Sequence, residues 1–341
     1  MFICKACVDT GGFMKSKILN MLKANENKFL SSAEISEALN ISRQAISKHM
    51  TQLKKQGHHI ESVSRKGHRY VSALEEIYNK AEIVSELQTD VLGKNLIFLE
   101  TVDSTNDYAK NIALDHDDMT VVLSDEQTAG KGRLGRQWAS EKGSGIWMSI
   151  ILKPDIEPAE APKITQIAAA AMTEAIESVI GEPIGIKWPN DIIYKKKKVC
   201  GVLTEMSAEL GGINYVVVGI GVNVAQTQFS EELVEKAISL KMGLERTVSR
   251  KEIVLSFLKS FEVLYQDFIT TKSLKRTIEI CKSRSILLNE TVRIITKAST
   301  RTVKVVDINE NGQLVIVNES GEREQVFYGE VSVRGLYEYV D

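Results

Sequence analysis

The sequence predicts an α+β chain of several domains: a small helical unit, then a central mixed β-sheet with helices, then a short all-β segment. Three observations support this. Short amphipathic helical patterns followed by a two-stranded wing fill residues 14–73, strand-like and helical runs alternate from residue 94, and short strands separated by turn residues follow Thr291. The chain has 341 residues, of which 43% are hydrophobic, and is therefore too long for one small core.

Composition excludes several broad classes of protein. The formal net charge of -2 argues against a uniformly basic nucleic-acid binder, so any such binding must come from a local patch. We find neither a run of about 18 apolar residues nor the apolar core of a signal peptide, and we expect a cytoplasmic protein without membrane contact. Four cysteines do not make a disulfide framework, and the CxxC of Cys4 and Cys7 lacks a second pair for a zinc site.

The predicted domain boundaries follow these patterns. Met14 opens a natural helical segment, so residues 1–13 are either a tail or an artefact of the chosen start. A helix-turn-helix domain is expected over residues 14–73 and a linker helix over residues 74–93. A central domain (94–288) and a C-terminal β domain (289–341) complete the chain.

Residues 31–71 have the pattern of a helix-turn-helix followed by a two-stranded wing. Ser31 and Glu34 form a capping box for one helix, and Ser42 caps the next. That next helix has an apolar face made by Ile46, Met50 and Leu53. Seven Lys or Arg residues lie between residues 31 and 71 against three Glu residues, a local balance of +4.

This basic balance favours DNA binding, in which polar residues at the start of the helix capped by Ser42 enter the major groove and wing cations hold phosphates. The residues expected to contact DNA are Arg43, Gln44, Ser47, Lys48, Arg65 and Lys66. The alternative is a three-helix interaction module whose lysines are only solvated.

The segment from Ser124 to Trp138 is the most informative of the central domain. Three glycines and three cations lie within residues 130–136. The glycines let backbone amides approach an oxyanion, and the cations neutralise phosphate charge. No helix follows the formal GxGxxG, and no Ser or Thr follows Lys131, which argues against a dinucleotide fingerprint and against a P-loop. We predict a flexible anion-binding loop; the alternative is a solvated basic turn.

Two further motifs contain polar residues near strand ends. In Lys187-Trp188-Pro189-Asn190-Asp191, a carboxylate and an amide are placed to hold Mg²⁺. Of the four lysines that follow, at 195–198, only Lys198 adjoins an apolar strand, so we expect it to point inward toward a carboxylate and a phosphate. In the segment 219–223, GIGVN, small residues permit close approach of a ligand beside Asn223.

Five motifs in this order resemble those of the bacterial biotin protein ligases. They are DSTN at 103–106, GKGRLGRQW at 130–138, KWPND at 187–191, KVCGVLTE at 198–205 and GIGVN at 219–223. The N-terminal segment resembles the winged helix of the bifunctional class, which also represses the biotin operon. The resemblance spans nearly the whole chain from Met14. It implies a central domain like that of class II synthetases and lipoate ligases, and a C-terminal SH3-like β-barrel.

The resemblance also assigns residues to biotin and ATP. Ser104, Thr105 and Gln127 match groups that bind the biotin ureido ring, with Asn106 beside them. Lys198 matches the lysine that contacts the biotin carboxylate and the α-phosphate. The loop expected to order over biotin and the adenylate contains Gly130, Lys131, Gly132, Arg133 and Arg136.

Other residues match positions around the nucleotide. Asp191 falls where the family places a residue for the nucleotide and Mg²⁺, and Lys187 belongs to the same nucleotide site. Trp138 and Asn223 match positions near adenine, and Arg334 matches an arginine near the phosphates. Many members have Arg in place of Lys131, so a point charge replaces a bidentate fork here.

The implied activity is ATP-dependent biotin ligation, with Lys198, Arg133 and Asp191 as the expected catalytic residues. Biotin and ATP form biotinyl-5′-AMP, which a lysine of biotin carboxyl carrier protein then attacks. The carrier belongs to acetyl-CoA carboxylase or pyruvate carboxylase, and Cys200 is expected to be core. As a repressor, the adenylate-bound chain would form a homodimer through the central sheet and bind operator DNA.

Two alternatives remain open. One is a repressor that binds biotin without ligating it. The other is a lipoate or related acyl ligase with an unrelated DNA-binding head.

Overall fold

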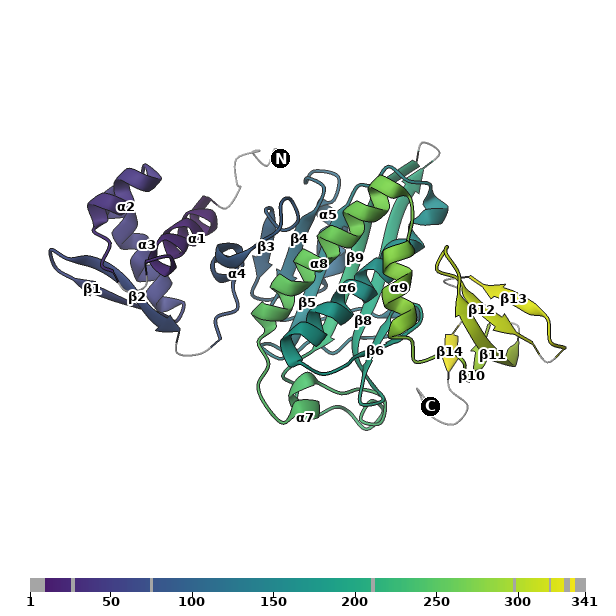
Figure 1. Ribbon diagram of the computed structural model, residues 1–341. Helices are drawn as coiled ribbons and strands as arrows, with labels where there is room; N and C mark the ends of the chain where they lie inside the picture. The colour runs from purple at the N-terminus through teal and green to yellow at the C-terminus, as the bar shows by residue number, and fades with distance from the viewer. Residues whose placement is uncertain are drawn as a thin grey trace. The chain divides into compact units, whose positions relative to one another are not determined.

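The computed structural model describes residues 10–25, 28–73, 76–209, 212–296, 299–318, 320–327 and 332–334. The chain divides into two compact units, residues 1–88 and residues 89–341. The predicted α+β composition is found, with a helical unit first and a mixed sheet and an antiparallel sheet in the second unit (Figure 1). No helix of the described part is long and apolar enough to cross a membrane.

The first unit contains the predicted helix-turn-helix and wing. Its elements are α1 (Thr10–Lys23), α2 (Ser32–Leu39), α3 (Arg43–Lys55), β1 (His58–Val63) and β2 (Gly67–Ala73). Ser31 and Glu34 form the capping box of α2, and the Ser42 hydroxyl caps α3. Burying one apolar face of each helix creates a single core. That core includes Ile18, Leu19, Leu22, Ile35, Ile46, Met50, Leu53, Ile60 and Tyr70.

The wing is attached to the helices by the segment that precedes α2. Leu30 and His68 exchange two backbone hydrogen bonds of 2.8 Å, which pairs Leu30 with strand β2. Gly67 has a φ of 111°, and a Cβ at this residue would lie 2.1 Å from the Leu30 carbonyl oxygen. Glycine is therefore required for this close approach.

The linker helix predicted over residues 74–93 is wrong in length. Helix α4 spans only Lys80–Glu86, and its Ala81 joins the core of the first unit. The ammonium of Lys23 on α1 donates a hydrogen bond of 2.7 Å to the carboxylate of Glu82. Because of these contacts, α4 is part of the first unit and is not a free connector.

A seven-stranded mixed sheet forms the centre of the second unit, in the order β3-β4-β5-β9-β8-β7-β6. Its strands are β3 (Leu96–Leu99), β4 (Thr120–Ser124), β5 (Gly145–Leu152), β6 (Gly185–Lys187), β7 (Asp191–Tyr194), β8 (Lys197–Glu209) and β9 (Gly212–Asn223). The β3–β4 pair is parallel, and the other pairs described are antiparallel. The helical elements are α5 (Thr105–Ile112), η1 (Arg133–Gly135), η2 (Pro158–Glu160), α6 (Pro162–Ile180), α7 (Leu240–Leu244), α8 (Arg250–Thr271) and α9 (Lys275–Ser283).

The two faces of this sheet carry different helices. Side chains alternate along a strand, so neighbouring residues of β8 point to opposite faces. Glu205 hydrogen-bonds Asn106 of α5 at 2.8 Å, whereas Thr204 hydrogen-bonds Thr165 of α6 at 2.9 Å. Helix α6 packs along α8 on its own face (Figure 1). The short α5 therefore leaves much of the opposite face open to a ligand.

The C-terminal strands form a separate antiparallel sheet in the order β13-β12-β11-β10-β14. They are β10 (Thr291–Ile295), β11 (Thr300–Ile308), β12 (Leu314–Val317), β13 (Arg323–Val326) and β14 (Ser332–Arg334). Within the described residues no pairing of β13 with β14 closes this sheet, so an all-β domain is found but a barrel is not. The domain contacts the central one at Gly312, whose carbonyl accepts hydrogen bonds from Gln166 and Trp188.

Candidate active site and DNA-binding surface

A pocket of about 540 Å³ lies on the α5 face of the central sheet. Most of the predicted ligand-binding residues line it, although they come from segments far apart in the sequence. They are Ser104, Thr105, Asn106, Gln127, Lys131, Gly132, Arg133, Arg136, Trp138, Lys187, Asp191, Lys198 and Asn223. Gly130 is buried behind the lining, and the side chain of Arg334 lies outside the described residues.

The glycine-rich segment is a loop, as predicted, and folds as an irregular hairpin. Lys131 pairs with Gln137, and the amide of Gly132 donates a hydrogen bond of 2.7 Å to the carbonyl of Arg136. A Cβ on Gly130 would lie 2.4 Å from the carbonyl oxygen of Trp138. Gly130 therefore lets the two sides of the hairpin approach each other and presents the three cations at the pocket.

Hydrogen bonds orient the polar groups at the α5 end of the pocket. The side-chain oxygen of Gln127 accepts bonds from the amide and hydroxyl of Thr105, at 2.8 and 3.0 Å. The buried hydroxyl of Ser149 lies 2.8 Å from the Thr105 hydroxyl and 2.6 Å from the side-chain oxygen of Asn106. Fixed donors and acceptors of this kind suit a small, neutral, polar ligand group.

Two glycines on adjacent strands make room for Trp138. Gly201 of β8 pairs with Gly221 of β9. A Cβ would approach the Trp138 ring to 3.0 Å at Gly201 and to 2.7 Å at Gly221. Because neither residue has a side chain, the indole lies against the sheet and forms an aromatic wall of the pocket.

The cationic end of the pocket is built on the β7–β8 hairpin. Lys195 and Lys196 have positive φ and form its turn, whereas Lys198 points inward, as predicted. The Lys198 ammonium lies 2.5 Å from a carboxylate oxygen of Asp191 and 5.2 Å from the centre of the Trp138 ring. One carboxylate thus lies among several cations, an arrangement that suits a polyanionic ligand.

Arg133 crosses the pocket to Asn190, the amide that the sequence analysis considered as a Mg²⁺ ligand. Its guanidinium donates a hydrogen bond of 2.9 Å to the side-chain oxygen of Asn190. The amide nitrogen of Asn190 in turn donates to the carbonyl of Val202 on β8, also at 2.9 Å. Asn190 therefore connects the loop to the sheet.

Asp107 is a residue that the sequence analysis missed. Its carboxylate pairs with Lys131 at 2.5 Å and with Lys110 at 2.9 Å. Burial alone would raise the pKa of Asp107, but hydrogen bonds from the two lysines outweigh it and lower the pKa below the ordinary value. The loop cation Lys131 is thus paired with a carboxylate that it shares with Lys110.

The segment 226–237 also lines the pocket, through residues that include Gln226, Phe229, Leu233 and Lys236. It has neither a helical nor a strand periodicity that would have drawn attention to it. Gln226 donates a hydrogen bond of 3.1 Å to the side-chain oxygen of Asn223. Cys200, by contrast, is fully buried and burial raises its thiol pKa, which suits a core residue.

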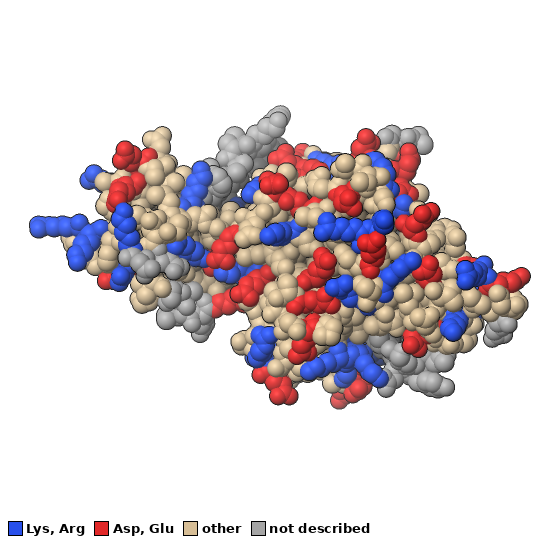
Figure 2. Space-filling view, viewed as in Figure 1, with Lys and Arg blue, Asp and Glu red and all other residues tan. Residues whose placement is uncertain are grey.

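The DNA-contact residues predicted in the first unit lie on α3 and in the turn of the wing. Arg43, Gln44, Ser47 and Lys48 of α3 are exposed, as are Arg65 and Lys66 in the turn of the wing. Figure 2 shows Lys and Arg side chains gathered around the tip of the β1–β2 hairpin. The basic patch predicted from composition is therefore a surface feature.

Comparisons with known proteins agree with this arrangement. The model of the biotin/lipoate A/B protein ligase family matches residues 98–223, that of an HTH domain matches residues 15–69, and that of the biotin protein ligase C-terminal domain matches residues 287–334. The bifunctional ligase/repressor BirA of Bacillus subtilis is 35% identical over 311 residues, which cover 90% of this chain and 95% of that protein. This chain belongs to the biotin protein ligase family.

Other members of the biotin protein ligase family resemble the chain to different extents. BirA of Escherichia coli is 26% identical over 255 residues, which cover 74% of this chain and 77% of that protein. The solved biotin protein ligase of Aquifex aeolicus in complex with biotin and ATP has a TM-score of 0.64 at 33% identity. It matches 71% of this chain and 99% of its own chain. The family resemblance inferred from the five motifs is confirmed.

Proposed function

We propose that this chain joins biotin to a lysine of a carrier protein at the expense of ATP, and that it represses transcription by binding operator DNA. The full-length relative at 35% identity carries both activities in its name. The observation that carries the proposal is that Lys198, Arg133 and Asp191 line the same pocket as the hydrogen-bonded Thr105 and Gln127.

The two ends of the pocket suit the two substrates. The neutral hydrogen-bonding end, with Ser104, Thr105, Asn106 and Gln127, would hold the ureido ring of biotin. The aromatic wall of Trp138 and the side chain of Asn223 would hold the adenine. In this orientation the biotin carboxylate and the α-phosphate meet near Lys198.

Charge neutralisation is the chemistry that this reaction requires. A carboxylate attacking a polyphosphate is repelled by it, so cations placed where the two anions meet lower the barrier. Lys198, Arg133, Lys131, Arg136 and Lys187 supply that charge. The carboxylate oxygen bonds to the α-phosphorus, the bond to the bridging oxygen breaks, and pyrophosphate leaves with its electron pair. The carrier lysine then attacks the anhydride carbonyl and displaces AMP.

Mg²⁺ is part of the proposed reaction. It is commonly held by one or two carboxylates together with substrate phosphates, and Asp191 offers one carboxylate beside the expected phosphate position. The described residues contain no cluster of three or more His, Cys, Asp or Glu side chains that could hold the ion without a nucleotide. Asp191 would therefore bind Mg²⁺ together with ATP, and the ion would supply charge neutralisation on the phosphates.

The repressor function extends the proposal to the first unit. We infer that biotinyl-5′-AMP orders the 130–136 loop, favours a homodimer, and lets two winged helices bind a palindromic site. We also infer cytoplasmic action, a carrier domain of acetyl-CoA carboxylase or pyruvate carboxylase as substrate, and an SH3-like fold for the C-terminal domain. Relatives named biotin–[acetyl-CoA-carboxylase] ligase support the first of these carriers.

The ligase is tested by incubating the protein with ATP, Mg²⁺ and an apo biotin carboxyl carrier domain, with either biotin or lipoate. We expect pyrophosphate release and a mass gain of one biotinyl group with biotin, and neither with lipoate. Transfer of lipoate would favour the acyl-ligase alternative. No release with either acid, in a protein that still binds DNA, would favour a biotin-responsive repressor.

The repressor is tested separately by DNA affinity and sedimentation with and without biotin and ATP. We expect the ligands to raise both the dimer fraction and the affinity for operator DNA. An affinity that stays unchanged on adding both ligands would contradict ligand-dependent repression.

A further inference from the structure

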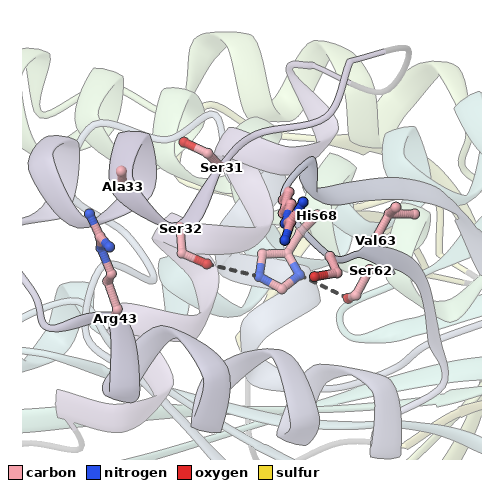
Figure 3. A pocket seen from close by; sticks show the side chains of 10 residues that line it. Ser31, Ser32, Ala33, Arg43, Ser62, Val63 and His68 are labelled. Atoms are coloured by element: carbon pink, nitrogen blue, oxygen red, sulfur yellow. Dashed lines mark hydrogen bonds between the residues drawn. The ribbon is translucent and has the colours of Figure 1, made fainter.

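A second pocket, of about 420 Å³, lies within the first unit between the helix-turn-helix and the wing. Its lining comes from three places: the start of α2, the first residue of α3, and the β1–β2 turn. Figure 3 shows His68 between Ser32 and Ser62, with Arg43 nearby. The ligation chemistry makes no use of this pocket.

A chain of hydrogen bonds fixes the direction of the polar groups in this pocket. The Lys54 ammonium, which can only donate, gives a bond of 2.8 Å to the Ser62 hydroxyl oxygen. The Ser62 proton is then directed to Nδ1 of His68, 2.8 Å away. Nε2 of the neutral imidazole carries the ring proton and donates it to the Ser32 hydroxyl oxygen at 3.3 Å. The Ser32 hydroxyl proton remains available for an acceptor in the pocket.

The neutral imidazole that this chain needs is the favoured form. Burial lowers the pKa of His68, and the charge of Lys54 lowers it further. The backbone of His68 is held by two hydrogen bonds to Leu30, so its Cα is fixed beside the segment that precedes α2. Ser32 is therefore oriented as a donor by the chain of hydrogen bonds that runs from Lys54 through Ser62 on β1 and His68 on β2.

Two arginines give the pocket its charge. Arg43 and Arg65 line it, both are exposed, and no Asp or Glu side chain is among the described residues that form its wall. The nearby Glu34 carboxylate is engaged by the Ser31 amide at 2.7 Å in the capping box. The pocket thus combines two guanidinium groups with a directed hydroxyl donor, a set that suits a phosphate oxyanion.

We propose that this pocket holds one backbone phosphate of bound DNA, contacted by Arg43, Arg65 and the Ser32 hydroxyl, with His68 as the positioning residue. The proposal rests on the DNA-binding function proposed above. The pocket lies where the recognition helix begins and the wing turns, so a phosphate there would fix the register of both on the duplex without reading bases. Ser32 thereby joins the DNA-contact set, and His68 acts through it.

The first test counts phosphates. Binding to a mixed-sequence duplex is measured by fluorescence anisotropy over a range of salt concentrations for R43A, R65A and the double variant. Each phosphate neutralised contributes about 0.9 to the slope of log K against log salt. Because both arginines contact one phosphate, the double variant is expected to lose about 0.9 in slope. A loss of about 1.8 would assign the arginines to two separate phosphates and overturn the proposal.

The second test follows the hydroxyl chain. S32A is expected to weaken DNA binding about tenfold with an unchanged salt slope, because a neutral donor to a charged group is lost. S62A should weaken binding in the same direction but add nothing in the S32A background, since it acts through Ser32. S85A, on α4, is the matched control and should change neither quantity. Additive effects of S32A and S62A, or no effect of S32A, would contradict the proposal.

The source of the phosphate is tested with inorganic phosphate alone. Specific shifts of the His68 ring resonances on adding phosphate, without competition from the duplex, would assign the pocket to a free anion and overturn the DNA assignment. If the wild-type protein fails to bind any duplex at low salt, the repressor function itself fails. Normal wild-type binding that none of these variants alters would reject only the phosphate pocket.

Discussion

The Lys198 ammonium on β8 lies 2.5 Å from the Asp191 carboxylate on β7, and the same ammonium lies over the ring of Trp138. This pair occupies the place in the pocket where the proposed biotin carboxylate and α-phosphate would meet. Asp191 therefore holds the lysine in position before the anions arrive. On binding, the two anionic groups of the substrates would compete with Asp191 for the ammonium.

Replacing Lys198 tests this role directly. K198A is expected to slow biotinyl-5′-AMP formation by about 10²–10³-fold, the usual effect of removing one electrostatic stabiliser. K198R should recover only part of the rate, because a planar fork does not fit the position of a point charge. Pyrophosphate release in single-turnover experiments measures the step. A K198A rate within a few fold of the wild type would exclude Lys198 from catalysis.

The glycines beneath Trp138 provide a second prediction. In G221A the new Cβ would lie 2.7 Å from the indole, so the ring must move away from the sheet. We expect a raised KM for ATP with little change in the affinity for biotin, measured by calorimetry. G221A combined with W138A should be no worse than W138A alone, because the clash then disappears. A lost biotin affinity in G221A would instead indicate a general distortion of the sheet.

The sequence anticipated much of this architecture because strong local rules apply to it. The capping box of Ser31 and the apolar face of α3 are local patterns, and the central strands β4 and β5 are continuous apolar runs. Of the four lysines at 195–198, only Lys198 adjoins an apolar strand, and this local difference predicts that it points inward. Each of these predictions needs only a few residues of context.

The contacts that sequence reasoning missed depend on distant residues meeting in space. Asp107 lies in α5 and Lys131 in the loop that follows β4, and Asn190 meets Arg133 from the turn between β6 and β7. The linker was predicted too long because the contacts of α4 with α1 override its helical periodicity. The long helix α8 was not predicted at all.

The ion pair between Asp107 and Lys131 predicts an unusual gain of affinity. Lys131 is half exposed, so the pair stabilises the free protein by no more than about 1 kcal/mol. A phosphate that takes Lys131 must first displace Asp107, and D107N removes this competitor. We expect D107N to bind biotinyl-5′-AMP up to about fivefold more tightly, measured by calorimetry. Weaker binding would mean that Asp107 positions Lys131 for the ligand and does not compete for it.

The C-terminal domain is expected to influence the nucleotide site through Trp188. Its indole nitrogen donates a hydrogen bond of 2.9 Å to the Gly312 carbonyl. Trp188 lies two residues before Asn190 and three before Asp191 in the sequence. In W188F this bond is lost, and we expect a raised KM for ATP. Gln166 still donates to the same carbonyl at 2.6 Å, so the hydrogen-bond part of the stability cost should stay near 1 kcal/mol, and the smaller ring adds a packing cost.

Q166L is the matched control for this prediction. It removes the other hydrogen bond to Gly312, but Gln166 belongs to α6 and does not line the pocket. Its stability should fall by a similar amount while the KM for ATP stays unchanged. Equal effects of W188F and Q166L on the KM would show that the carbonyl acts only through general stability.

The last prediction concerns Gly67, which joins the wing to the helix-turn-helix. An alanine at this residue must adopt a φ near 111° and would place its Cβ 2.1 Å from the Leu30 carbonyl oxygen. The backbone strain alone costs about 1–3 kcal/mol, and relieving the overlap requires separating Leu30 from His68. We expect G67A to lower the unfolding temperature of the first unit and to weaken DNA binding. Adenylate formation should be unaffected, because the pocket for biotin and ATP lies wholly in the second unit. Calorimetric unfolding beside the pyrophosphate assay measures both quantities, and a parallel loss of ligase activity would show that the two units do not behave independently.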